Sequence, residues 1–302
     1  MAHPPPFEQR SSQSGHSGAV VMSAFGFISS PSEAGFHIGP LFVHVYGLSY
    51  VVGVGAAILL TRELWKREGG DPKLPAEVAL WAFPAGLIGA RIYFLITTPG
   101  QIPPHWWGPF AIWKGGLGSW GGIAAGVAAA IWVLRRRLDR TQVRRFMDVA
   151  TPSILVATAC VRVGNYFNQE LFGKPSALPW ALKVDPAHRP PGYVRFATFQ
   201  PTFLYEIIFN LIFAAILIGL VRSRRIRPPG VFALYVAGYS GYRIFEETLR
   251  IDYSNYILGM RLNFWIALIL CLVSIAWFVV IQRQWRIPWP WRRQGAAAQR
   301  RA

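Results

Sequence analysis

The sequence predicts an all-α integral membrane protein: a bundle of seven transmembrane helices with the N-terminus outside and the C-terminus in the cytoplasm. Apolar segments of membrane-spanning length, a low content of charge and alternation of basic residues along the chain lead to this fold class. Of the 302 residues, 53% are hydrophobic and only 15% are charged, whereas about a quarter of a soluble domain is charged. This composition excludes a disordered chain, which needs low hydrophobicity, and argues against an ordinary soluble globule.

Seven apolar segments have the length of a span, since about 20 helical residues cross about 30 Å of hydrocarbon. The first, second, fourth, fifth and seventh are long apolar segments. Glycine and polar residues interrupt the third and the sixth. We retain both because glycine is more frequent in membrane helices than in soluble ones. In chain order the segments are residues 41–60, 76–97, 116–134, 146–166, 201–221, 231–247 and 262–281.

The basic residues indicate the orientation of these spans. The net charge of +17 would by itself suggest a nucleic-acid binder. However, 20 of the 31 basic residues lie in the first, third and fifth loops and the C-terminal tail, and eight lie in the N-terminal segment and the other loops. The positive-inside rule assigns the richer set to the cytoplasm, which requires an odd number of spans. Because the charge alternates with the loops, we exclude a nucleic-acid-binding face.

Outside the spans, the sequence divides into two tails and one long loop. Residues 1–40 are rich in Pro, Ser and Gly and predict a disordered extracytoplasmic segment without a recognisable secretory signal. Residues 41–282 form the transmembrane domain, and its extracytoplasmic loop, about 167–200, has a composition that permits either an arm or a gate. Residues 283–302 form a basic cytoplasmic tail.

Two cysteines bear on the class of protein. Cys160 and Cys271 both lie inside apolar segments, so a disulfide-stapled secreted scaffold is excluded. We interpret both as small buried apolar residues.

Three arginines lie inside predicted spans. Arg91, Arg162 and Arg243 each fall within about six residues of the outer end of the second, fourth and sixth span. An arginine at bilayer depth costs about 2.5–3.5 kcal/mol on insertion scales. Snorkelling to the interface is the simpler interpretation for one arginine. Three at one depth favour a shared site for an anion in the outer leaflet.

The most specific stretch is residues 162–173. It places Arg162, Asn165, Asn168 and Glu170 within nine residues at the end of a span. Near-helical spacing allows one face to present a guanidinium, an amide and a carboxylate together, and Gly173 permits a turn or a close approach. The alternative is a polar helix cap with an internal salt bridge.

A second polar stretch covers residues 238–250. Tyr239, Arg243, Glu246 or Glu247, and Arg250 follow one another at three- or four-residue spacing. On a helix they form one polar stripe that could face the bundle interior and present an arginine, held by carboxylates, to a phosphate. The alternative is an internally paired structural stripe.

Shorter motifs reach the same depth on other spans. They are Tyr46-Gly47, the glycines and arginine of 89–91, the glycine-rich residues 115–122, and residues 200–206, which include Tyr205 and Glu206. Taken singly, each is more simply packing or capping. Six spans that place polar residues or glycines at one depth indicate a common site.

These residues resemble the prolipoprotein diacylglyceryl transferases, a family of bacterial inner-membrane enzymes. Residues 162–173 are similar to the family's signature, and residues 46–47, 89–91, 204–206 and 238–250 resemble its other blocks. The resemblance covers roughly residues 41–282 and implies a multi-pass protein of the bacterial cytoplasmic membrane with its active site toward the outer leaflet. It implies transfer of the diacylglyceryl group of phosphatidylglycerol to the lipobox cysteine of a pre-lipoprotein, forming a thioether and releasing glycerol phosphate.

From this reaction we expect Arg162 and Arg243 to clamp the phosphate, stabilise its developing charge and lower the pKa of the incoming thiol. Glu170 and Glu247 would hold these arginines, one of them accepting the proton, while Tyr46, Asn165 and Tyr239 would orient the headgroup. No metal or nucleotide motif is recognisable, so we expect no cofactor. The expected catalytic residues are Arg162, Arg243, Glu247 and Tyr46, and the expected substrate-binding residues are Arg162, Asn165, Asn168, Glu170, Gly173, Arg91, Tyr239, Tyr205, Glu206 and Arg250.

Two positions depart from the family pattern. Trp120 and Gln200 stand where the family often has histidine, so a histidine base is missing from its usual place. All six histidines fall on the outer side of the predicted topology. Only His44 and His105 lie near the spans that carry the polar motifs, and we interpret them as water-exposed residues at the membrane interface.

Two other classes of protein stay open. A lipid or anion transporter would also place arginines inside a membrane, in an arginine-lined outer-leaflet site. It would show flux without a covalent product. The other class is a non-catalytic membrane receptor.

Overall fold

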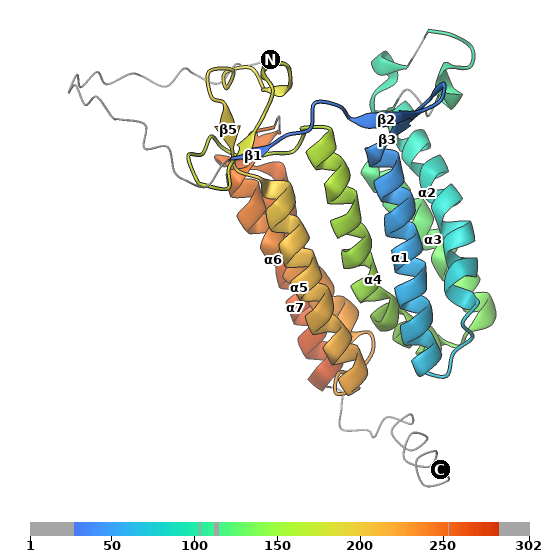
Figure 1. Cartoon of the computed structure of the whole chain (residues 1–302). Helices are drawn as coiled ribbons and strands as arrows, with labels where there is room; N and C mark the ends of the chain where they lie inside the picture. Colours follow the sequence, from blue (N-terminus) through green and yellow to red (C-terminus); the bar gives the residue numbers. More distant parts are fainter. Residues whose placement is uncertain (1–26, 103, 112–114, 253, 284–302) are drawn as a thin grey trace.

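The computed structural model describes residues 27–102, 104–111, 115–252 and 254–283, and these are mostly helical. Figure 1 shows the helices standing side by side, with the chain reversing direction from each helix to the next. Each of the seven predicted spans coincides with one helix, shifted by a few residues at either end. The α-helices are α1 (Val45–Arg67), α2 (Leu74–Thr97), α3 (Ser119–Arg137), α4 (Arg140–Phe167), α5 (Thr202–Ser223), α6 (Gly230–Leu249) and α7 (Leu262–Arg283).

Five of these helices, α1, α2, α4, α5 and α7, are long and apolar enough to cross a membrane. The other two, α3 and α6, are the helices for which glycine and polar residues interrupt the sequence pattern. α3 ends in three consecutive arginines, and α6 carries the polar stripe from Tyr239 onward. Large apolar side chains on the outer faces of the helices are exposed, among them Val51, Leu80 and Val273, as expected for faces that meet lipid.

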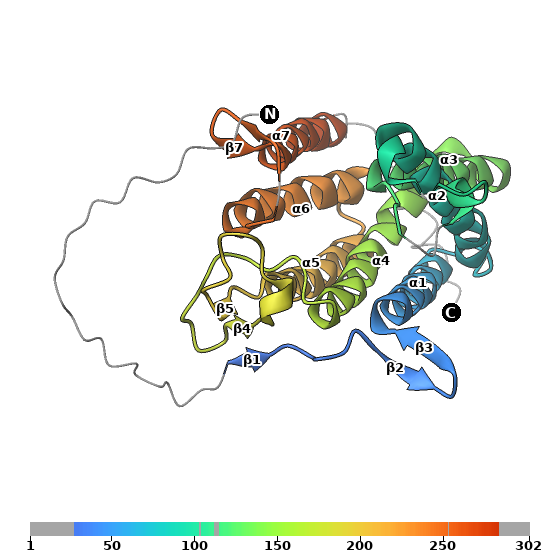
Figure 2. The same ribbon diagram turned by 90° about the horizontal axis from the view of Figure 1, so that it is seen from above.

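Helix α4 is the centre of the arrangement. Viewed along the helices, it separates α1, α2 and α3 on one side from α5, α6 and α7 on the other (Figure 2). It packs along both α1 and α5, while α2 packs along α3 and α6 along α7. Asp139 caps the N-terminus of α4 by accepting from the backbone N–H of Thr141 and Gln142 at 2.7 and 2.8 Å, and the Gln142 side chain completes a capping box.

Close packing of α2 on α3 explains much of the glycine in these two helices. Gly89 and Gly121 face each other, and a Cβ on either would overlap the carbonyl oxygen of the other. The two backbones therefore approach as only small residues allow. This contact fixes α3 against the part of α2 that carries Arg91.

The two ends of the helices differ in structure. The strands and the described parts of the long connections between α2 and α3, α4 and α5, and α6 and α7 gather at one end, which we call the strand end (Figure 1). The opposite end, the basic end, holds the short connections 68–73 and 224–229 and the arginines that close α1, α3, α5 and α7. Arg91, Arg162 and Arg243 all lie toward the strand end of their helices.

The strands in the described part of the chain form three small sheets. One contains β1 (Ile28–Ser29), parallel to β4 (Leu182–Lys183), which is antiparallel to β5 (Thr198–Phe199). The hairpins are β2 (Gly35–Ile38) with β3 (Leu41–His44), and β6 (Tyr256–Ile257) with β7 (Met260–Arg261). Short 3-10 turns are η1 (Pro99–Gln101), η2 (Gly108–Phe110) and η4 (Pro186–His188).

Strands β1 and β2 fall inside the segment 1–40, for which the composition predicts disorder. Ile28 donates its N–H to Ala181 O at 3.0 Å, and Ser29 O accepts from the Tyr166 hydroxyl at 2.6 Å. A partner distant in the sequence thus orders β1, whereas β2 is ordered by its hairpin with the neighbouring β3. Residues 1–26 and the predicted tail 284–302 lie outside the described residues.

The loop between α4 and α5 is folded. Phe172, Leu182, Val184, Phe199 and Phe203 form an apolar core beneath its strands. A second, larger apolar core packs α1, α4, α5 and α6 around Leu64, Phe146 and Leu217, nearer the basic end. The polar side chains described next lie between these two cores.

Candidate active site

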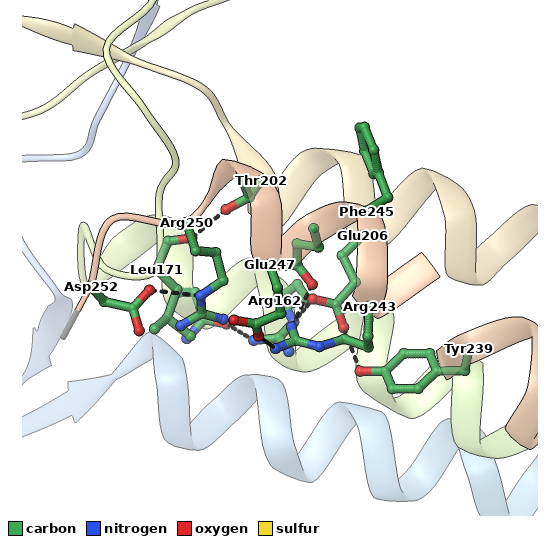
Figure 3. Close-up of polar contacts among 12 residues, drawn as sticks. Arg162, Leu171, Thr202, Glu206, Tyr239, Arg243, Phe245, Glu247, Arg250 and Asp252 are labelled. Carbon is green, nitrogen blue, oxygen red and sulfur yellow. Dashed lines mark hydrogen bonds and ion pairs between the residues drawn. The ribbon is translucent and has the colours of Figure 1, made fainter. Parts of the chain in front are cut away.

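Polar side chains from three helices meet at the strand end. We call Arg162, Glu206, Tyr239, Arg243, Glu246 and Glu247 the arginine–glutamate cluster. Arg162 Nε of α4 lies 2.6 Å from Glu206 Oε2 of α5, and the Tyr239 hydroxyl of α6 donates to Glu206 Oε1 at 2.9 Å. Figure 3 shows the guanidinium and the phenol meeting this one carboxylate. Because Glu206 is 0% exposed, removing either partner leaves polar atoms buried.

Arg243 is held by its own helix and, indirectly, by the following connection. It pairs with Glu246 and Glu247 one turn further along α6. Glu247 Oε2 also accepts from Arg261 Nε at 2.7 Å. Guanidinium and carboxylate groups therefore alternate in this region. The charged side chains of the polar stripe predicted from the sequence are thus paired with one another and with Arg261.

Asp252 extends this alternation. It accepts from Arg250 Nε at 2.7 Å and from Arg261 Nη2 at 3.0 Å. Burial raises the pKa of Asp252, but hydrogen bonds and charges from Arg250 and Arg261 outweigh it and hold the pKa below its usual value. Arg250 thus contacts Asp252, just beyond α6, where it helps to fix the connection to α7.

The signature stretch brings its guanidinium, amide and carboxylate together, as the helical spacing indicates. Arg162 Nη1 donates to Asn165 Oδ1 at 2.9 Å, and Asn165 Nδ2 donates to Glu170 Oε1 at 2.6 Å. Asn168 Nδ2 lies 3.4 Å from the same Glu170 oxygen. One expected pairing differs: Arg162 takes Glu206 as its counterion, while Glu170 accepts from the two asparagines.

Glu170 lies in a backbone turn just beyond α4. Gln169 and Leu171 on either side of it have φ of 51° and 58°, a left-handed conformation that costs a non-glycine residue about 1–3 kcal/mol and often occurs at functional sites. The Gln169 amide holds the turn by donating to Pro31 O and Asp185 Oδ2 at 2.8 and 2.7 Å, and by accepting from Asp185 N at 2.8 Å. The fold therefore fixes the backbone from which the Glu170 carboxylate projects.

Tyr46 of α1 lines a cavity beside the cluster. Its backbone and ring lie where a Cβ on residue 164 would be, so Gly164 allows α1 to approach α4 closely. A cavity of about 390 Å³ between α1, α2 and α4 opens beside it. Tyr46 and Arg162 line this cavity together with mainly apolar residues such as Phe83 and Val161.

Arg91 lies in a different environment. It is 6% exposed, and its guanidinium donates to the connection between α2 and α3 while stacking 5.1 Å from the Phe94 ring centroid. Four hydrogen bonds to main-chain carbonyls match the donors of this side chain well. The structure therefore does not bring Arg91 together with Arg162 and Arg243. The acceptors are Gly108 O, Pro109 O, Gly115 O and Gly116 O, at 2.7, 2.8, 2.7 and 2.9 Å.

The start of α5 carries a separate polar chain. Tyr205 donates to Gln200 Oε1 and accepts from Trp180 Nε1, each at 3.1 Å. Gly173 donates its N–H to Gln200 O at 2.9 Å, and a Cβ there would lie 3.0 Å from Gln200 Cβ. Gly173 thus permits a close approach of the chain.

Trp120 is 55% exposed at the start of α3.

Sequence reasoning missed several residues of this region. Arg261 counted only as a loop charge, although it contacts Glu247. Gln169 lies inside the signature stretch, but the sequence pattern does not predict it as a site residue. Asn210, four residues after Glu206 on α5, is 0% exposed, and neither atom of its amide has a hydrogen-bond partner among the described residues. The signal in the sequence was an amide within the apolar run that follows Glu206 in this span.

Comparison with known proteins gives a consistent result. A family model described as prolipoprotein diacylglyceryl transferase matches residues 33–280. A phosphatidylglycerol–prolipoprotein diacylglyceryl transferase of Frankia alni is 44% identical over 263 residues, which cover 86% of this chain and 68% of the relative. Proteins of the same name from Streptomyces coelicolor (number 2) and Cutibacterium acnes are each 40% identical, over 84% and 85% of this chain and 80% and 88% of their own length.

Proposed function

This chain belongs to the prolipoprotein diacylglyceryl transferase family, and on that premise we propose that the arginine–glutamate cluster is the centre of its transfer reaction. The chain is a transferase of lipoprotein biosynthesis. Its reaction moves the diacylglyceryl group of phosphatidylglycerol to the lipobox cysteine of a pre-lipoprotein. A thioether forms, and glycerol phosphate leaves.

The observation that carries the proposal is the pairing of Arg162. Its Nε faces a fully buried carboxylate, and its Nη1 donates to an amide. A guanidinium has five N–H donors, so Arg162 keeps donors without a partner among the described residues, and these can bind a phosphate while Glu206 fixes the orientation of the group. Arg243 of α6 belongs to the same cluster, where it pairs with Glu246. Two preorganised guanidinium groups stabilise the charge that accumulates on the departing phosphate.

The cavity beside Tyr46 supports a role in binding the lipid. It is about 390 Å³ in volume, largely apolar, and has Arg162 on its wall. An acyl chain in this cavity would place the adjoining headgroup at the guanidinium. Tyr46, Asn165 and Tyr239 would then orient that headgroup by hydrogen bonds.

We place the strand end of the seven helices toward the outer leaflet of the bacterial cytoplasmic membrane. The arginines that close α1, α3, α5 and α7 lie at the opposite end, which the positive-inside rule assigns to the cytoplasm. All seven helices then cross the membrane, with the N-terminus outside and the C-terminus inside. The site faces the side on which a pre-lipoprotein emerges.

The test is transfer of radiolabel from phosphatidylglycerol in vesicles to a synthetic lipobox peptide. Replacing Arg162 or Arg243 by Ala should lower transfer by about 100-fold to 1,000-fold. Arg137→Ala, which removes an exposed ion pair with Glu77 at the basic end, is the matched control and should leave transfer unchanged. Full transfer by correctly inserted Arg162→Ala protein would refute the assignment. Movement of labelled lipid across the vesicle without labelled peptide would instead favour a transporter.

A further inference from the structure

The reaction needs an acceptor for the thiol proton, because a cysteine with a pKa near 8.5 is mostly protonated at neutral pH. Trp120 occupies a position where a histidine would be a candidate base, but an indole N–H only donates. The acceptor must therefore be sought among the carboxylates of the cluster and Glu170 of the adjoining signature stretch.

Most of these carboxylates are already neutralised by arginine. Glu206 pairs with Arg162, Glu246 with Arg243, and Glu247 with both Arg243 and Arg261. A carboxylate held by a guanidinium is a weaker proton acceptor, because the positive charge favours its ionised form. Within the part of the chain that the structure describes, Glu170 is the carboxylate of this site with no ion pair to Arg or Lys.

Glu170 has neutral partners instead. Its Oε1 accepts from Asn165 Nδ2 at 2.6 Å and lies 3.4 Å from Asn168 Nδ2. Two amides on one oxygen orient the carboxylate and leave its second oxygen, Oε2, for another partner. Glu170 is also partly exposed, unlike the buried Glu206 and Glu247, so an incoming peptide can reach it.

The position of Glu170 suits a proton transfer beside the phosphate. Only the Asn165 amide separates its carboxylate from the Arg162 guanidinium. A thiol at Glu170 would therefore lie next to a phosphate bound at Arg162. The left-handed residues Gln169 and Leu171 hold the backbone on both sides of the carboxylate, as is common where a fold fixes a reactive group.

Accordingly we propose that Glu170 is the catalytic residue that accepts the proton of the lipobox thiol, an inference that rests on the proposed transfer function. The S–H bond breaks and its proton moves to Glu170 Oε2. The sulfur electron pair forms the S–C bond to the glyceryl carbon. The C–O bond to phosphate breaks, and its electron pair leaves on the phosphate oxygen. The proton then passes from Glu170 to water or to the released glycerol phosphate.

The experiment compares two synthetic lipobox peptides, one with cysteine and one with selenocysteine, whose selenol is ionised at neutral pH. Glu170→Gln keeps the size of the side chain and an acceptor for Asn165, but it removes the base. Transfer to the cysteine peptide should fall by about 100-fold or more. Transfer to the selenocysteine peptide should stay within about tenfold of the unmodified protein, because that substrate needs no base.

Equal loss with both peptides would overturn the proposal and leave Glu170 a structural role. Glu170→Asp serves if the Gln variant does not fold: it retains a base and should transfer to selenocysteine normally, whereas equal loss with both peptides would again overturn it. Glu77→Gln at the basic end is the matched control and should change neither rate. Arg162→Ala should lose both transfers, and if the unmodified protein labels neither peptide, the proposed function itself fails.

Discussion

The environments of Arg91 and Arg162 differ although their sequence contexts are alike. Both arginines lie near the strand end of a helix, and both are largely buried. Arg91 donates to four main-chain carbonyls of the connection between α2 and α3, whereas Arg162 pairs with a carboxylate and an amide side chain. The main-chain acceptors engage the donors of the Arg91 guanidinium, so this side chain fixes the connection between α2 and α3. A carboxylate neutralises the charge of Arg162 and leaves donors of this guanidinium for the phosphate that we propose it binds. The two arginines are thus distinguished by their partners more than by their depth or burial.

The largest expected effect comes from removing the counterion of Arg162. Glu206→Gln leaves a buried guanidinium without its charge partner and should lower the free energy of unfolding by about 3–5 kcal/mol. Glu77→Gln breaks an exposed pair with Arg137 and should cost less than about 1 kcal/mol. Denaturant titration of the protein in detergent measures both. Similar small losses would mean that Glu206 does not hold Arg162.

Substitution by lysine tests the two arginines directly. Arg162→Lys removes the forked geometry that binds a phosphate and should lower transfer by about 100-fold. Arg91→Lys retains a cation for the carbonyls of the connection and should lower transfer by less than about tenfold. Initial rates of label transfer at equal amounts of inserted protein give the comparison. A reversed order would make Arg91 the substrate-binding arginine.

Two neighbouring tyrosines on α6 offer a finer comparison. Tyr239→Phe removes a hydrogen bond to the charged Glu206 and should cost about 1.5–3 kcal/mol, or roughly tenfold or more in transfer. Tyr242→Phe removes a buried hydroxyl that has no hydrogen-bond partner among the described residues and should be neutral or slightly stabilising. Thermal unfolding and transfer rates measure each effect. Equal effects of the two variants would contradict the role given to Tyr239.

The smallest effect concerns pH. The depressed pKa of Asp252 means that its pairing with Arg250 and Arg261 stabilises the fold above the unfolded pKa of about 3.9 and is lost as pH falls through the folded value. Asp252→Asn should therefore lower the Tm at pH 7, and this difference in Tm should shrink steadily as the pH falls below the unfolded pKa of about 3.9. A Tm difference that persists unchanged in acid would show that the charge of Asp252 is not responsible.

Local periodicity accounts for what could be predicted from the sequence. Apolar segments locate all seven helices, because a run of about 20 mainly apolar residues is the length that an α-helix needs to cross the hydrocarbon of a bilayer. The grouping of Arg162, Asn165 and Glu170 follows from helical spacing, although Glu170 reaches the group through a turn beyond α4. The sequence pattern also suggested the weaker apolar character of α3 and α6.

What could not be predicted depends on partners far apart in the chain. The pairing of Arg162 with Glu206 requires α4 to pack on α5, and no spacing within either helix encodes that contact. The carbonyls around Arg91 belong to a connection whose backbone path has no side-chain signature. Strand β1 is held by distant partners, the strand β4 and the Tyr166 hydroxyl of α4. Each of these features arises from tertiary packing.

The position of bound phosphatidylglycerol tests the central claim most directly. A cryo-electron microscopy structure of the full chain in lipid nanodiscs would locate the headgroup phosphate relative to Arg91, Arg162 and Arg243. We expect the phosphate within hydrogen-bonding distance of Arg162 and Arg243, with an acyl chain in the cavity beside Tyr46 and the carbonyls of the α2–α3 connection still on Arg91. A phosphate bound at Arg91, with Arg162 and Arg243 paired only to their glutamates, would contradict it.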